Sequence, residues 1–267
     1  MRQTQAISEA LPDYAPETRQ LLFGYTLQLA DTSLMLAHRL SEWCGHGPVL
    51  EQDIALSNIA LDLLGETRSL YQYAAELEGQ GRTEDDLAFL REAVAYRNPL
   101  LVELPNGDFG QTVLRQFFFD TFHYFFLQQL QNKKDPRLAA IAEKSLKEAA
   151  YHIKWSAEWV IRLGDGTAES KRRMEQALDQ LWMYTGELFT MTDTEQQLLQ
   201  QGFAPDYSQI RQQWEAQVAQ VFAEATLTVP QHAYMQQGGK TGLHTEHLGY
   251  LLADLQYMQR AYPGLEW

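Results

Sequence analysis

The sequence contains very little cysteine, few basic residues and no long apolar stretch. One cysteine, Cys44, in 267 residues excludes an internal disulfide and any zinc or iron–sulfur site built from several thiolates. A net charge of −14 argues against a nucleic-acid-binding protein, because such proteins present a basic face. No apolar run approaches the roughly 20 residues that span a bilayer, and residues 1–20 lack the apolar core of a secretory signal. We therefore expect a cytoplasmic protein with no membrane or nucleic-acid partner, in which any metal must be bound by carboxylates and histidines.

Runs of alternating β-branched residues are also missing, and helical periodicity dominates instead. Four long helices are predicted at about 17–45, 50–79, 109–132 and from 136 to the LGDG sequence at 163–166. Shorter helices are predicted at about 84–96, 167–191, 193–201, 207–226 and 247–260. The four long helices form two hairpins joined by a long crossover, which is the connectivity of a ferritin-like four-helix bundle. The sequence thus predicts an all-α fold, with a loose polar tail at 1–16 and a single domain at 17–267 that carries additional C-terminal helices.

The helix expected at 50–79 carries a carboxylate inside an apolar stripe. The stripe alternates three- and four-residue steps and comprises Leu56, Ile59, Leu63, Glu66, Leu70, Tyr73 and Leu77. A buried carboxylate needs a hydrogen-bonding partner, a cation or a proton. Asp62 lies one turn before Glu66, beside the same stripe.

The other three long helices repeat this pattern. Their ionisable residues on apolar faces are Asp31, His38 and Glu42 on the first helix, Asp120 and His123 on the third, and Glu148 and His152 on the fourth. Each residue taken alone fits a salt-bridged or rim position, and His123 fits a hydrogen-bonded core histidine. Their coincidence at mid-length of four helices favours a shared polar cluster in the interior of the bundle.

A dinuclear iron site in such a bundle needs one carboxylate from each of two helices and a Glu-x-x-His pair from each of the other two. In KEAAYHIKW, the position three residues before His152 is Ala149. If Glu66 occupies the histidine position of the second helix, the glutamate position is Leu63. We therefore expect a degenerate di-iron pocket with no metal, formed by Glu42, Leu63, Glu66, Asp120, Ala149 and His152. A single metal ion at the residual ligands stays an open alternative.

Several segments resemble a known family along nearly the whole chain, from about residue 20 to 267. They are RLSEWCGHGPVLEQDIALSNIALDLLGETRSLYQYAAELEG, NPLLVELPNGDF, DPRLAAIAEKSLKEAAYH, RLGDGT and GGKTGLHTEHLG. The sequence resembles the non-catalytic ferritin-like subunit (the PaaC family) of the bacterial multicomponent phenylacetyl-CoA 1,2-epoxidase.

This resemblance implies a structural subunit in phenylacetate catabolism that pairs with a related di-iron catalytic subunit and with the other epoxidase subunits. The ligand pattern of the catalytic subunit matches here at Glu42, Asp120 and His152, and departs at Leu63, Glu66 and Ala149. The resemblance implies that the NADPH, flavin and iron–sulfur centres lie in a separate reductase and that this chain holds no cofactor. A peripheral contact with phenylacetyl-CoA stays open.

Two other functions compete with this interpretation. One is an autonomous metal-dependent oxidase or oxygenase with an atypical carboxylate–histidine site, and the other is an apo-bundle scaffold in an unrelated pathway. The segment Gly238–Gly249 leaves a further alternative open, because His244 and His247 could chelate a metal, whereas the neighbouring glycines favour helix capping or docking.

Overall fold

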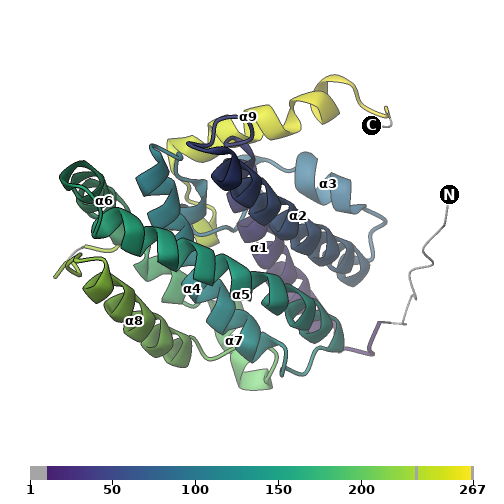
Figure 1. The fold of residues 1–267 in the computed structure, drawn as a ribbon. Coiled ribbons are helices and arrows are strands. Elements are labelled where there is room, and N and C mark those ends of the chain that lie inside the picture. Colours follow the sequence, from purple (N-terminus) through teal and green to yellow (C-terminus); the bar gives the residue numbers. More distant parts are fainter. Residues whose placement is uncertain (1–10, 232–233, 266–267) are drawn as a thin grey trace.

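The computed structural model describes residues 11–231 and 234–265, and Figure 1 shows their arrangement. The four long helices are α1 (Pro16–Ser41), α2 (Leu50–Glu78), α4 (Phe109–Leu130) and α5 (Pro136–Gly164). The pairs α1/α2 and α4/α5 form hairpins, and α2 also packs against α5. Within the described ranges there are helices and turns but no strand. The prediction of an all-α, ferritin-like bundle is confirmed.

Local sequence explains where the long helices begin and end. Asp135 caps α5 by accepting a hydrogen bond from the Leu138 backbone N–H, and Pro136 occupies the first helical turn, where no N–H is needed. Helix α2 ends at Gly79, whose φ of 68° lies in the left-handed region that glycine adopts without a steric penalty. These signals fix where the helices of each hairpin begin and end, and therefore which side chains lie opposite each other.

The crossover between the hairpins is less helical than predicted. Helix α3 (Glu84–Phe89) is followed by short 3₁₀ turns, η1 (Ala93–Ala95) and η2 (Leu100–Glu103), so the single helix expected at 84–96 is wrong. The chain turns because the Arg91 side chain is buried, where it donates to the carbonyl oxygens of Leu87 and Ala95. These side-chain bonds replace helical ones, and the ion pair of Arg91 with Asp31 attaches the crossover to α1.

The C-terminal part covers the bundle on two sides. Its elements are α6 (Ala168–Leu181), η3 (Trp182–Tyr184), η4 (Gly186–Phe189), α7 (Asp193–Gln201), α8 (Tyr207–Glu224), η5 (Gly239–Thr241) and α9 (Glu246–Ala261). Helices α6 and α8 pack against α4 and α5, whereas α9 packs against α1 and α3. The helix expected at 167–191 stops at Leu181, because two 3₁₀ turns follow and the Thr185 hydroxyl bonds to the Trp182 carbonyl.

The N-terminal tail differs from expectation in its described part. Tyr14 packs edge-on against Phe203 and donates a hydrogen bond of 2.8 Å to Asp135. Residues 11–15 are therefore attached to the bundle, and residues 1–10 of the predicted tail lie outside the described part. None of the helices described is both long and apolar enough to cross a membrane.

Candidate functional site

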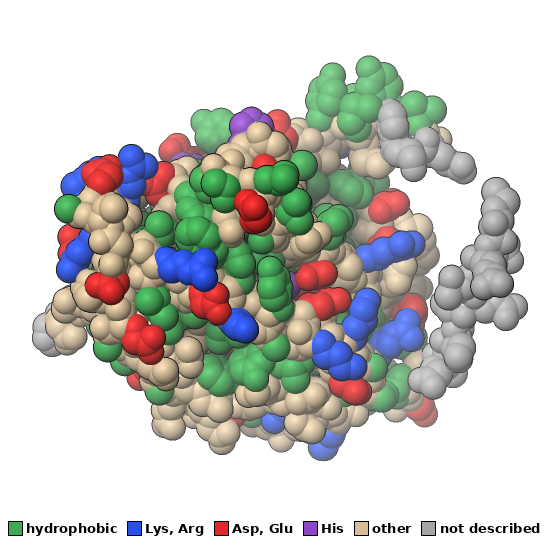
Figure 2. All heavy atoms as spheres, in the orientation of Figure 1, with side chains coloured by type: hydrophobic (Ala, Val, Ile, Leu, Met, Phe, Trp, Pro, Cys, Tyr) green, Lys and Arg blue, Asp and Glu red, His purple; other side chains and the backbone are tan. Residues whose placement is uncertain are grey.

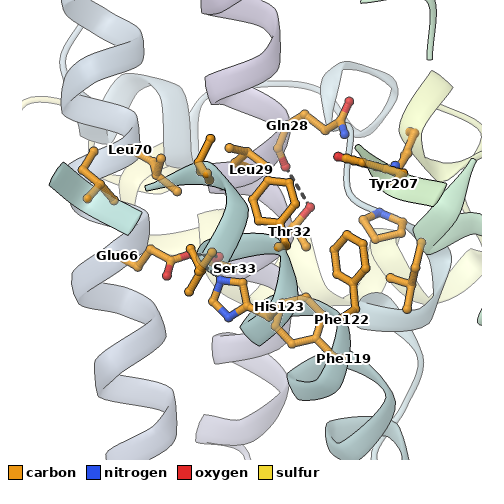
Figure 3. Close-up of a pocket in the computed structure, with 17 residues that line it drawn as sticks. Gln28, Leu29, Thr32, Ser33, Glu66, Leu70, Phe119, Phe122, His123 and Tyr207 are labelled. Atoms are coloured by element: carbon orange, nitrogen blue, oxygen red, sulfur yellow. Dashed lines mark hydrogen bonds and ion pairs between the residues drawn. The ribbon is translucent and has the colours of Figure 1, made fainter. Parts of the chain in front are cut away.

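The centre of the bundle contains a buried pair of Glu66 on α2 and His123 on α4. The Nε2 atom of His123 lies 3.1 Å from a Glu66 carboxylate oxygen, and the Ser33 hydroxyl of α1 donates to the same oxygen at 2.8 Å (Figure 3). Both ionisable side chains are buried. The carboxylate that the sequence places inside an apolar stripe therefore has its partners within the protein.

The two charges of this pair support each other. Burial alone would raise the pKa of Glu66, but the charge and hydrogen bond of His123, with bonds from serines, outweigh it and hold this pKa below its usual value. Burial would likewise lower the pKa of His123, yet the Glu66 carboxylate raises it above its usual value. The pair therefore favours a carboxylate facing an imidazolium.

A second carboxylate–imidazole pair joins α2 to α5. Nε2 of His152 lies 3.0 Å from a carboxylate oxygen of Asp62; the histidine is buried and Asp62 is half-buried. Glu148 lies half-buried at the rim of the same region, where burial and the charge of Asp62 raise its pKa. His152 thus bonds with its Nε2 atom to a protein carboxylate.

Asp120 on α4 is almost fully buried and accepts a 2.6 Å hydrogen bond from the Gln116 side chain. Burial raises the pKa of Asp120 to about 6, although the nearby His152 and His123 act in the opposite direction. This carboxyl group is therefore partly protonated near neutral pH, and it lies within electrostatic reach of both histidines.

Glu42 lies apart from this cluster. It is exposed at the end of α1, where it accepts hydrogen bonds from Arg39 and Asn106. Ser33 is the α1 residue that contacts the buried pair, and Glu42 follows it by nine residues, or about 13 Å along a helix. The prediction that Glu42 lies in the interior pocket is therefore wrong.

Asp31 and His38 also face other parts of the molecule. Asp31 is fully buried against the crossover, where it pairs with Arg91 and accepts hydrogen bonds from the Tyr71 hydroxyl and the Arg97 backbone N–H. His38 is half-buried, and burial lowers its pKa, with Glu42 and Asp254 partly opposing. Asp254 belongs to α9, which packs against α1, so a charge on the C-terminal helix acts on His38.

The donors present do not fit a dinuclear iron centre. The two positions that would supply paired glutamates, Leu63 and Ala149, are apolar, and each is only 1% exposed. Glu66 and His152 are bonded to protein partners, and Glu42 is remote. Within residues 11–231 and 234–265, no group of three or more His, Cys, Asp and Glu side chains is placed to hold a metal ion.

The segment at 238–245, which we term the anchored segment, is held by buried glutamates that the sequence did not single out. Glu187 accepts from the backbone N–H groups of Gly238 and Lys240, and the Lys240 ammonium lies 3.1 Å from Glu195. Gly239 passes so close to the crossover that an added Cβ would lie 2.3 Å from the Asn98 carbonyl oxygen. Close backbone approach therefore explains the glycine at this position.

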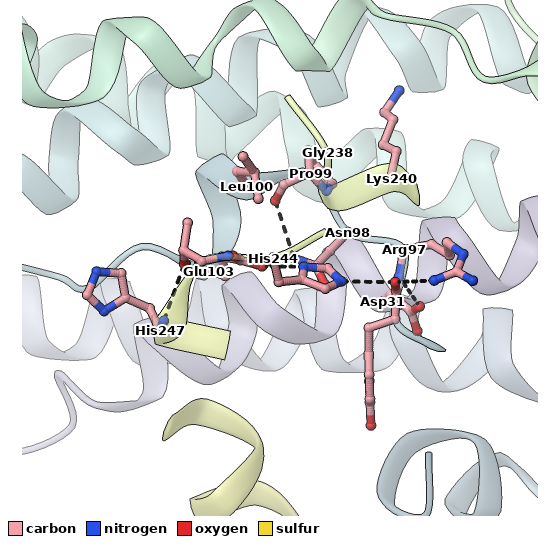
Figure 4. Close-up of polar contacts among 12 residues, drawn as sticks. Asp31, Arg97, Asn98, Pro99, Leu100, Glu103, Gly238, Lys240, His244 and His247 are labelled. Carbon is pink, nitrogen blue, oxygen red and sulfur yellow. Dashed lines mark hydrogen bonds and ion pairs between the residues drawn. The ribbon is translucent and has the colours of Figure 1, made fainter. Parts of the chain in front are cut away.

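His244 completes these contacts (Figure 4). Its Nδ1 lies 2.8 Å from Glu103 and its Nε2 lies 3.0 Å from the Tyr96 carbonyl oxygen, so both ring nitrogens face acceptors. Burial alone would lower the pKa of His244, but the hydrogen bond and charge of Glu103 raise it above its usual value. The imidazole ring of His247 points away from this network. The geometry therefore supports docking of this segment onto the bundle rather than metal chelation by His244 and His247.

The outer side of α2 is unusually apolar. Leu50, Ile54, Leu61 and Leu64, which we term the α2 stripe, are exposed and lie within an arc of about 80° on the helix. Leu50 is 72% and Leu61 64% exposed. Tyr151 on the neighbouring α5 is exposed as well, and Figure 2 shows hydrophobic side chains gathered on this face. Exposed apolar patches of this kind mark interaction surfaces.

Comparison with known proteins identifies the family of the chain. The chain is 50% identical over 246 residues to a protein of Escherichia coli (strain K12) that is named as a subunit of 1,2-phenylacetyl-CoA epoxidase, covering 92% of this chain and 99% of that protein. The family described as "Phenylacetic acid catabolic protein" matches residues 3–267, which is nearly the full length. On this evidence the chain belongs to the phenylacetic acid catabolic protein family.

Proposed function

We propose that the chain is a structural, non-catalytic subunit of a phenylacetyl-CoA 1,2-epoxidase and pairs with a di-iron catalytic subunit of the same family. One observation carries the proposal. The interior positions where a di-iron bundle has its paired glutamates are the buried Leu63 and Ala149, and the remaining Glu66 and His152 are already bonded to His123 and Asp62. The fold of a metal-binding bundle is therefore retained without its ligand set.

The partner would dock on the α2 stripe and Tyr151. These five apolar side chains are exposed along one long helix and its neighbour, so a partner bundle could cover them with a helical face of its own. The Escherichia coli relative is named as one subunit of an enzyme, which supports an assembly of several chains. In such an assembly the catalytic iron and the electron-transfer cofactors belong to the other subunits.

Co-expression with a di-iron subunit encoded beside this chain tests the pairing. We expect the two chains to co-purify, and epoxidase activity to require both. The variant Leu61→Glu places a charge in the middle of the α2 stripe and should abolish co-purification, whereas Val94→Glu, at a similarly exposed apolar position in η1, should leave it intact.

Metal analysis separates the competing functions. The isolated chain should carry well below one iron per molecule and show no oxidase activity. Two irons per chain together with activity in isolation would establish the autonomous oxidase instead. A folded, metal-free chain that binds no di-iron subunit would favour a scaffold in another pathway.

A further inference from the structure

A small apolar pocket, which we term the cavity, lies within the bundle beside the Glu66–His123 pair (Figure 3). Its volume is about 40 Å³, and it lies among α1, α2, α4 and the 3₁₀ turn η4. Its walls include Leu29, Leu70, Phe119, Phe122, Leu127 and Leu188. Because protein interiors are normally close-packed, a lasting void of this size within a well-formed core requires an explanation.

Most polar groups at the edges of the cavity are already engaged with one another, and the Nδ1 atom of His123 is a buried exception without a hydrogen-bond partner. At one end, Ser33 and His123 bond to Glu66. At the other end, the side chains of Gln28, Tyr207 and Lys240 all bond to Glu195, which is not itself part of the wall. A buried water is stable when it makes about three hydrogen bonds, and these groups offer few. The interior of the cavity is therefore suited to an apolar occupant.

A surface cleft lies next to the cavity. This cleft, of about 260 Å³, opens between α2 and α5, and Glu66 and Ile141 line both it and the inner cavity. Its outer part is polar, with Ser69, Gln72, Arg137 and Lys144. Glu66 and Ile141 lie between the two spaces, so motion of those two side chains would connect them.

We propose that the cavity binds a small, uncharged, apolar molecule of the size of dioxygen, which enters through the α2–α5 cleft. Size and wall chemistry define this class. Benzene occupies an apolar protein cavity of about 150 Å³, so an aromatic ring does not fit here. Ions are excluded because the walls offer no unpaired counter-charge. The inference is independent of the proposed subunit role, because it rests on the shape and lining of this chain alone.

Two probes test the site in the intact chain. Crystals pressurised with xenon should show one xenon atom among Phe119, Phe122 and Leu127. In solution, dissolved dioxygen should broaden the methyl resonances of Leu29, Leu127 and Ile141 through its paramagnetism, while those of Leu252 in α9, which is buried but remote from the cavity, should change little.

A variant that fills the cavity with a larger side chain tests whether xenon and dioxygen bind there. Leu127→Phe should remove both the xenon peak and the broadening, whereas Leu252→Phe should retain them. Ordered waters filling the cavity, xenon bound only elsewhere, or unchanged binding in a folded Leu127→Phe protein would each overturn the proposal. If Leu127→Phe does not fold, Leu188→Phe fills the cavity from η4, and the measurements on the unmodified chain stand by themselves.

Discussion

Glu66 and His123 stabilise the fold most strongly while both are charged. The lowered pKa of Glu66 adds stability above its unfolded pKa of about 4.3, which is lost as pH falls through the folded value. The raised pKa of His123 adds stability below about 6.5, which is lost as pH rises through its folded value. We expect Glu66→Gln to lower the free energy of unfolding by about 3 kcal/mol near pH 5.5 and by less at pH 8.5.

Urea unfolding at the two pH values measures this difference. Glu158→Gln is the control, because Glu158 pairs with Arg162 on the surface and its loss should cost less than about 0.5 kcal/mol at either pH. An equal effect of Glu66→Gln at pH 5.5 and 8.5 would show that the ion pair does not contribute as a pair of charges.

Asp120 should have the opposite effect on stability. Because burial raises its pKa to about 6, the folded state favours the protonated carboxyl, and ionisation above that pH destabilises the protein. One pKa unit corresponds to about 1.4 kcal/mol, so Asp120→Asn should raise the free energy of unfolding by up to about 3 kcal/mol at pH 8. Little change is expected at pH 4. Thermal or urea unfolding across this range checks the prediction, and destabilisation at pH 8 would refute it.

The sequence predicted that Glu66 needs a partner, but it could not identify which one. A carboxylate inside a regular apolar stripe is visible from spacing along one helix, whereas its pairing with His123 depends on how two helices align. Glu42 was misplaced for a related reason. Helix α1 is buried on nearly all sides, so its apolar residues do not mark a single inward face, and the neutral Ser33 carried no signal.

At the scale of structural elements, the local stability of the anchored segment should depend on His244. Since the folded pKa of His244 is raised, its contribution is fully present below about pH 6.5 and is lost as pH rises through the folded value. We expect His244→Ala to accelerate amide hydrogen exchange in residues 238–245 by at least about tenfold at pH 6, with a smaller ratio at pH 9. Removing the ring leaves Glu103 buried with fewer donors.

His247→Ala serves as the matched control, because the same residue type lies three positions away with its ring directed out of the network. Its exchange rates should equal those of the unmodified chain. If residues 238–245 exchange as slowly in His244→Ala as in the unmodified chain, the contacts of His244 are not needed to hold the segment, and other bonds such as those to Glu187 suffice.

Regular elements were predicted well where helix signals are local. Caps, prolines and terminal glycines placed the four long helices and α7 within a few residues of their bounds. The segments at 84–96 and 167–191 failed because tertiary contacts end each helix early. Buried Arg91 pairs with Asp31 of α1 within the first segment, and in the second Glu187 bonds to the backbone of the anchored segment.

For the molecule as a whole, similarity to the Escherichia coli protein suggests interchangeability. Half of the residues are identical over 99% of that protein. Resting on the proposed function, we expect this chain to restore growth on phenylacetate to an Escherichia coli strain from which that relative has been deleted. Leu61→Glu should fail to restore growth while Val94→Glu succeeds. Restoration by both variants would exclude the α2 stripe as the docking surface.

The anchored segment also has a consequence for synthesis of the chain. Glu103, Glu187 and Glu195 are all made before residues 238–245, yet those later residues supply many of their hydrogen bonds. During translation the four long helices can therefore assemble while three carboxylates destined for the interior still lack these partners. Completion of these hydrogen-bond networks waits for residues 238–245, and a bundle formed without them would hold buried charge that is not compensated. A chain lacking residues 238–245 should therefore be less stable than one that carries them, although its four long helices are intact.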